Sequence, residues 1–201
     1  MTRFLLIRHA TTDAVGQRFS GRLPGVPLNA AGQTQARQLA ARLAPLPLHA
    51  VYTSPLERAA QTAAPVAATH GLTPAVDAAF LELDLGEWTN KTFQELHGDP
   101  QFHLFNTFRS GTRIPGGELM LEAQARIVAG LQRLAGRHPQ QTVAVVSHSD
   151  LIKAALAYYV GIPLDLSQRL EISPASVSVL EIYPETARLV LLNHLGALEN
   201  N

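Results

Sequence analysis

The sequence RFLLIRHATT at residues 3–12 decides the fold class and contains the first candidate site residues. Four consecutive apolar residues, Phe4 to Ile7, are typical of a strand that is buried in a sheet. Arg8 and His9 follow where such a strand should emerge into a loop. A neutral imidazole can attack phosphorus, and a neighbouring guanidinium can hold phosphoryl oxygens through paired hydrogen bonds. The pair alone is weak evidence, because an arginine and a histidine also occur together at ordinary strand ends.

Outward from this strand, the apolar pattern alternates between strands and helices. It predicts strands at 3–8, 50–53, 142–147, 176–183 and 187–193, and helices at 31–43, 55–68, 116–137 and 150–159. Ser54 is expected to cap the second helix, with Pro55 as its first residue. This order favours one α/β domain over residues 1–201 with a mostly parallel sheet. The less regular segment at about 90–115 is expected to be a lid-like insertion over the carboxyl edge of the sheet.

The composition excludes several classes of protein. Sixteen basic and sixteen acidic residues cancel, so no overall field draws the chain to nucleic acid or to an anionic membrane. The absence of cysteine excludes disulfides and thiolate catalysis. No apolar run approaches the ~20 residues that span a bilayer, and the N-terminal run is too short for a signal peptide. We therefore expect a cytoplasmic protein with neither a nucleic-acid nor a membrane partner; a homodimer is allowed.

Three charged or titratable side chains should meet at the carboxyl edge of the sheet. His9 ends the first strand, Arg58 lies in the first turns of the helix after the second strand, and His148 follows the run at 142–147. Parallel strands place such positions side by side, although Arg58 could also be a solvated helix arginine and His148 a buried, hydrogen-bonded histidine. The helix expected from Asp150 would add amide dipoles that favour an anion.

A metal site is the other interpretation of His148 with Asp150. No HxxH or HExxH spacing occurs among the eight histidines, so neither a metal nor another cofactor is expected.

Six blocks, in the order in which the family has them, resemble the histidine phosphatase superfamily, also called the phosphoglycerate mutase-like family. The blocks are RHATT at 8–12, RFSGRLPGVPLNAAGQTQA at 18–36, SPLERAAQTA at 54–63, LELDLGEW at 81–88, PGGE at 115–118 and VVSH at 145–148. The resemblance implies a three-layer α/β/α sandwich with a mostly parallel central sheet, which agrees with the apolar pattern.

The resemblance also implies roles for individual residues. His9 matches the nucleophile that becomes phosphohistidine, and Arg8, Arg58 and His148 match the residues that hold the phosphoryl oxygens. Glu82 matches the proton donor; without the resemblance, the acidic stretch would not distinguish it from Asp84 or Glu87.

Thr12, Ser20 and Gly21 match positions that line the substrate pocket. The sequence departs from the common pattern at Ala10 and Ser149, where the family usually has glycine. These side chains add atoms beside the phosphate, so we expect the size of the pocket to differ from the common pattern.

The function implied is a metal-independent phosphomonoesterase acting on a small phosphorylated metabolite. A phosphoglycerate mutase-type transfer is the alternative and would use basic residues of the insertion, such as Lys91, Arg109 and Arg113. An inactive phosphate-binding module is disfavoured, because the matched positions keep competent side chains. The phenylalanines of the insertion are expected to form a subsidiary core rather than a surface for substrate.

Overall fold

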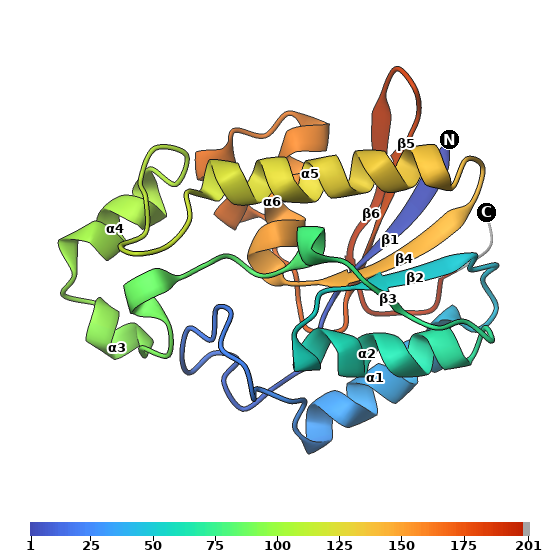
Figure 1. Ribbon diagram of the computed structural model, residues 1–201, viewed down its shortest axis with the longest axis horizontal. Helices are drawn as coiled ribbons and strands as arrows, with labels where there is room; N and C mark the ends of the chain where they lie inside the picture. Colours follow the sequence, from blue (N-terminus) through green and yellow to red (C-terminus); the bar gives the residue numbers. More distant parts are fainter. Residues whose placement is uncertain (199–201) are drawn as a thin grey trace.

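The computed structural model describes residues 1–198 and contains one six-stranded sheet between helices (Figure 1). The strand order is β3-β2-β4-β1-β5-β6. The strands are β1 (Thr2–Arg8), β2 (Ala50–Thr53), β3 (Ala75–Val76), β4 (Thr142–Ser147), β5 (Val177–Ile182) and β6 (Ala187–His194). Strand β5 is antiparallel to both of its neighbours, whereas the pairings among β1 to β4 are parallel.

Helices cover both faces of the sheet. In Figure 1, α1 (Ala30–Leu43) and α2 (Glu57–Ala68) lie below it, and α5 (Met120–Arg137) and α6 (Ser149–Val160) lie above it. The shorter helices are α3 (Phe93–Leu96), α4 (Pro100–Thr107) and the 3₁₀ helices η1 (Ala78–Phe80), η2 (Gly86–Trp88) and η3 (Leu164–Arg169). The predicted α/β/α sandwich with a mostly parallel sheet is confirmed.

Strand β1 is the centre of this arrangement because both of its faces are buried. Phe4 and Leu6 pack into the cluster formed with α5 and α6, while Leu5 and Ile7 pack into the cluster formed with α1 and α2. None of these four side chains is more than 1% exposed. Burial on both faces explains why the strand is an unbroken apolar run and not an alternating one.

Two predicted helix starts are wrong. Helix α2 begins at Glu57, after a Leu56 N-cap that makes no side-chain cap bond. The hydroxyl of Ser54, expected to be the cap, lies 2.8 Å from His148 Nε2. Helix α5 begins at Met120 instead of Gly116, because Gly116 has a φ of +65°.

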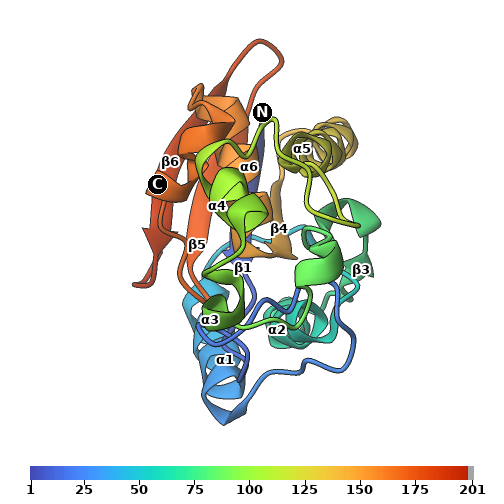
Figure 2. The ribbon, with the colours of Figure 1, turned by 90° about the vertical axis from the view of Figure 1, so that its left-hand side faces the viewer.

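The segment at 90–115 is more regular than expected and contains α3 and α4, which lie at the end of the molecule that faces the viewer in Figure 2. A capping box formed by Thr92 and Glu95 starts α3. Asp99 caps α4, and Pro100 is its first residue. These are ordinary helix-start signals, so both helices could have been predicted.

Helix α1 is held against the loop after β1 by Gly32. A Cβ atom at Gly32 would lie 1.9 Å from the carbonyl oxygen of Thr11. The same carbonyl accepts a hydrogen bond from the amide of Asn29, at 3.2 Å. The absence of a side chain at Gly32 therefore allows α1 to approach the backbone that carries His9.

We predict that Gly32→Ala lowers the free energy of unfolding by about 1–3 kcal/mol, because the added methyl group overpacks a backbone contact. Gly136 is the matched control: it lies in α5, and a Cβ atom there meets nothing within 4 Å. Gly136→Ala should therefore leave stability unchanged or raise it by up to about 1 kcal/mol. Urea denaturation of both variants checks this, and equal stability of the two would show that the helix does not need the close approach.

Candidate active site

The ends of β1 and β4 lie at the same level of the sheet and bring the two site histidines together. Arg8 at the end of β1 pairs with Ser147 at the end of β4. The amide of His9 donates to the Ser147 carbonyl, at 2.9 Å, so the next residue of each strand is a histidine. The ring centroids of His9 and His148 are 5.2 Å apart. The parallel sheet therefore produces this pair, as the sequence predicted.

The His9 ring is fixed in one tautomer by the backbone. Its Nδ1 lies 2.7 Å from the carbonyl oxygen of Ala10. A carbonyl only accepts hydrogen bonds, so Nδ1 carries the hydrogen and Nε2 keeps a free lone pair. Burial, followed by the charge of Arg58, lowers the pKa of His9 to about 3. The imidazole is therefore neutral at physiological pH.

Two arginines place buried N–H groups beside this ring. The Arg58 side chain is buried, and its Nη2 donates to the Gly21 carbonyl at 2.7 Å. Arg8 Nη1 donates to the Ile172 carbonyl at 2.6 Å. In residues 1–198, Arg58 Nη1 and Arg8 Nε are buried without a hydrogen-bond partner. Buried guanidinium hydrogens without acceptors are costly, so this part of the pocket is suited to an anion.

Glu82 is a partly buried carboxyl group next to these charges. Its Oε1 accepts from the Leu83 amide at 2.8 Å, and its Oε2 lies 3.7 Å from His148 Nδ1. Burial, followed by the charge of Asp150, raises the pKa of Glu82 to about 7, although Arg58 opposes the shift. Glu82 can therefore gain or lose a proton near neutral pH.

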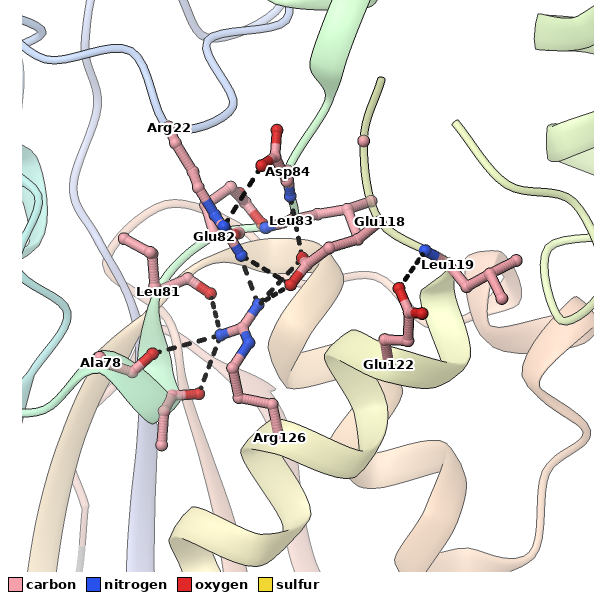
Figure 3. A network of polar contacts seen from close by, with 12 residues as sticks. Arg22, Ala78, Leu81, Glu82, Leu83, Asp84, Glu118, Leu119, Glu122 and Arg126 are labelled. Carbon is pink, nitrogen blue, oxygen red and sulfur yellow. Dashed lines mark hydrogen bonds and ion pairs between the residues drawn. The ribbon is translucent and has the colours of Figure 1, made fainter. Parts of the chain in front are cut away.

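The Glu82 backbone is held by a network around Glu118, the last residue of the PGGE block (Figure 3). Arg22 Nε donates to the Glu82 carbonyl at 2.9 Å, and Arg22 Nη2 pairs with Glu118 Oε1 at 2.7 Å. From the other side, Arg126 of α5 pairs with Glu118 Oε2 at 3.1 Å and donates to the Leu81 carbonyl at 2.7 Å. These contacts connect the loop before α1, the Glu82 loop and α5.

The candidate residues line one pocket of about 300 Å³. Those that line it are Arg8, His9, Thr12, Ser20, Gly21, Arg58 and Glu82. His148 is fully buried and lies behind the pocket wall, with Nε2 on Ser54 and without a hydrogen-bond partner for Nδ1 in the described part of the chain. Burial lowers the pKa of His148 well below its ordinary value, so its ring is neutral too.

The pocket also contains residues that the sequence analysis did not assign to it: Asp150 and Lys153 come from α6, and Gln168 comes from η3. Arg109, which the sequence analysis considered only for the mutase alternative, lines the pocket from the loop after α4. Asp150 and Lys153 are three residues apart and share a helix face, which is a detectable signal. Gln168 has no such signal, because only the tertiary fold brings η3 to this place.

The phenylalanines of the 90–115 segment divide into two groups. Phe105 is buried, and it packs on Trp88 together with Phe102, each with ring centroids 5.4 Å from those of Trp88. These rings pack as part of the main buried cluster that contains Phe4 and Leu6, so they extend the main core and do not form a separate one. The predicted subsidiary core is also wrong for Phe108, which is half exposed, and for Phe93, which is half exposed and lines the pocket with Phe102.

Within residues 1–198, no three His, Cys, Asp or Glu side chains are grouped so that they could hold a metal ion. None of the helices described there combines the length and the apolar composition needed to cross a bilayer.

A family model described as the histidine phosphatase superfamily, branch 1, matches residues 4–195. The chain belongs to this superfamily. Both histidines and both arginines of the pocket region lie within the matched residues.

The relatives include phosphatases and phosphoglycerate mutase-like proteins. A protein of Mycobacterium tuberculosis described as bifunctional is 36% identical over 98% of this chain, which spans only 55% of that relative's length. Phosphoserine phosphatase 1 of Hydrogenobacter thermophilus is 30% identical over 98% of this chain and 95% of its own. The α-ribazole phosphatase of Shigella flexneri has a similar structure, with a TM-score of 0.87, 27% identity, and coverage of 99% of this chain and 100% of that chain.

We predict that vanadate raises Tm, because an oxyanion that binds the buried arginines stabilises the folded protein. Arg58→Ala should weaken vanadate binding by about tenfold or more, since it removes charge-assisted hydrogen bonds. Arg37→Ala, which removes an exposed arginine of α1, is the matched control. The Tm of each variant across a vanadate titration measures its affinity for vanadate. Equal affinities of Arg58→Ala and Arg37→Ala would show that Arg58 does not face the anion.

Proposed function

We propose that this protein is a phosphomonoesterase that hydrolyses a small phosphorylated metabolite through a phosphohistidine intermediate. The geometry of His9 carries the proposal: its neutral ring donates from Nδ1 to the Ala10 carbonyl at 2.7 Å, which leaves the Nε2 lone pair free in a ring that lines one pocket with Arg8 and Arg58. Nucleophile and anion-binding groups thus occur in one pocket, as phosphoryl transfer requires.

In the first step, His9 Nε2 attacks the phosphorus atom, a P–N bond forms, and the bond to the leaving oxygen breaks. Arg8 and Arg58 stabilise the charge on the equatorial oxygens, and His148 supports the same site from behind the pocket wall. Glu82 gives its proton to the leaving oxygen, so the product departs as an alcohol. A pKa of about 7 makes the protonated form of Glu82 available near neutral pH.

In the second step, water replaces the alcohol. The Glu82 carboxylate accepts a proton from water, the water oxygen attacks phosphorus, and the P–N bond breaks. Inorganic phosphate leaves, while His9 and protonated Glu82 are restored. The arginines supply the positive charge, so the mechanism needs no metal and no cofactor. Thr12, Ser20 and Gly21 form the pocket wall and would contact the substrate beside the phosphoryl group.

A phosphoglycerate mutase-type transfer is the second candidate, supported by the phosphoglycerate mutase-like relatives. Turnover of p-nitrophenyl phosphate in EDTA tests the phosphatase. A mutase would require a bisphosphorylated primer to convert its substrate. An inactive module would show neither p-nitrophenyl phosphate turnover nor primer-dependent conversion.

We predict that His9→Ala abolishes turnover together with the acid-labile, base-stable phosphoryl label that quenching leaves on the wild type. His194→Ala is the matched control, because His194 lies at the end of β6 and does not line the pocket. Rapid quench with ³²P-labelled substrate measures the label. Undiminished label on His9→Ala would assign the nucleophile to another residue.

We predict that Glu82→Gln slows phosphohistidine formation from an alkyl phosphate much more than from p-nitrophenyl phosphate, since an alkoxide needs a proton and a nitrophenolate hardly does. In the wild type, formation from the alkyl phosphate should fall as the pH rises through about 7, where Glu82 loses its proton. The rate of phosphohistidine formation in the variant should not show this decrease with pH.

Burst rates for both substrates across pH measure these effects, with Glu87→Gln as the control at an exposed carboxyl of the same block. Equal losses on both leaving groups in Glu82→Gln would exclude Glu82 as the acid.

A further inference from the structure

The ring of His148 has a polar group beside each of its two nitrogens. Nε2 lies 2.8 Å from Ser54 Oγ, and Nδ1 lies 3.7 Å from Oε2 of Glu82, which lines the pocket. Burial lowers the pKa of His148 well below its ordinary value, so the ring is neutral and carries one hydrogen. The nitrogen that carries this hydrogen decides whether Nδ1 presents a donor or a lone pair to the pocket side.

The Ser54 hydroxyl group has one hydrogen to donate and two lone pairs with which to accept. One lone pair accepts from the Leu56 amide, at 3.4 Å. In residues 1–198, His148 Nε2 is the only acceptor within hydrogen-bond distance of the hydroxyl hydrogen. Ser54 is fully buried, so bulk water cannot replace that acceptor. The hydrogen of Ser54 therefore belongs to the bond with Nε2.

The two possible directions of this bond differ in cost. If Ser54 donates, the Nε2 lone pair is satisfied and Nδ1 carries the hydrogen toward Glu82. If Ser54 accepts, its own hydrogen is buried without an acceptor, which is unfavourable. In that arrangement the Nδ1 lone pair would also face the Glu82 carboxylate and any bound anion. Both effects favour a Ser54 hydroxyl that donates.

The start of α2 gives independent evidence that Ser54 has a task outside its own helix. Serine is among the residues most favoured as an N-cap, and Ser54 lies just before the first turn. The N-cap is nevertheless Leu56, which makes no side-chain cap bond. The protein forgoes a stabilising cap at this position, and the hydroxyl group contacts His148 instead.

We propose that Ser54 is a positioning residue whose hydroxyl donates to His148 Nε2 and so fixes the tautomer in which Nδ1 carries the hydrogen. This inference rests on the proposed phosphatase function, in which a phosphoryl group lies beside the two histidines. An N–H donor at Nδ1 stabilises phosphoryl oxygens, whereas a lone pair there would repel them. Ser54 does not line the pocket, so it acts through His148 and does not touch the substrate.

Long-range ¹H–¹⁵N NMR tests the tautomer directly, because protonated and unprotonated ring nitrogens resonate at different frequencies. Spectra are recorded below the Glu82 pKa of about 7, where the charge of Glu82 does not bias the ring. His148→Asn identifies the His148 signals by their loss. We expect the Nδ1–H form in the wild type and a measurable share of the Nε2–H form in Ser54→Ala. The Nε2–H form in the wild type would overturn the proposal, as would an unchanged tautomer in Ser54→Ala.

Vanadate binding tests the consequence for the anion site without requiring turnover. Ser54→Ala should weaken vanadate binding by about tenfold, the effect of one hydrogen bond to a charged group. Ser178→Ala is the matched control: Ser178 is a buried serine of β5 that accepts from the Asn193 amide at 3.1 Å and does not line the pocket. Each variant loses one buried hydroxyl group, so a general loss of stability would appear in both.

A double-mutant cycle separates an effect through His148 from a displacement of α2, which also carries Arg58. On the His148→Asn background, Ser54→Ala should change vanadate affinity by less than about twofold, because the ring that Ser54 orients is absent. An equal loss on both backgrounds would show that Ser54 acts by another route and would overturn the proposal. Turnover of p-nitrophenyl phosphate decides the phosphatase proposal separately, because neither the tautomer nor the affinity depends on turnover.

Discussion

The positive charge of two arginines at the carboxyl edge of the sheet is the constraint on which the rest of the candidate site depends. Arg58 is buried and Arg8 is partly buried, and both act on the two titratable groups beside them. At His9 their charge adds to burial and keeps the ring neutral. At Glu82 it opposes burial, and burial wins, so the carboxyl group titrates near neutrality. Burial and the arginine charges together therefore leave a neutral imidazole at His9 and a carboxyl group at Glu82 that can exchange protons near neutral pH.

The sheet was the most predictable part of the molecule because burial on both faces leaves a plain signal. The runs at 50–53 and 142–147 match β2 and β4 to the residue. Helix starts were less predictable where the capping residue has another task. Ser54 contacts His148 instead of capping α2. At the PGGE block, a Cβ atom on Gly117 would lie 2.4 Å from the Asp84 carbonyl oxygen, so the glycines serve a close backbone contact and not the first turn of α5.

The candidate site was predictable only where the topology alone determines it. His9, Arg58 and His148 follow strand ends, and a parallel sheet gathers such positions. Glu82 lies in a loop fixed by Arg22 and Arg126 through Glu118, so local sequence could not distinguish it from its acidic neighbours, and the family resemblance selected it. The pocket residues Arg109, Asp150 and Gln168 come from three separate elements, and no spacing in the sequence links them.

The hydrogen bond that fixes the His9 tautomer has a consequence for how such a protein can evolve. In many sites a second side chain orients the histidine, and one substitution can remove it. Here the acceptor is a backbone carbonyl, which every amino acid supplies, so no exchange at residue 10 deletes it. Ala10 occupies a position where glycine is common in the superfamily, and the acceptor is still present. The tautomer of His9 is thus robust to mutation at the neighbouring residue, so the side chains of the pocket wall can change without disturbing this ring.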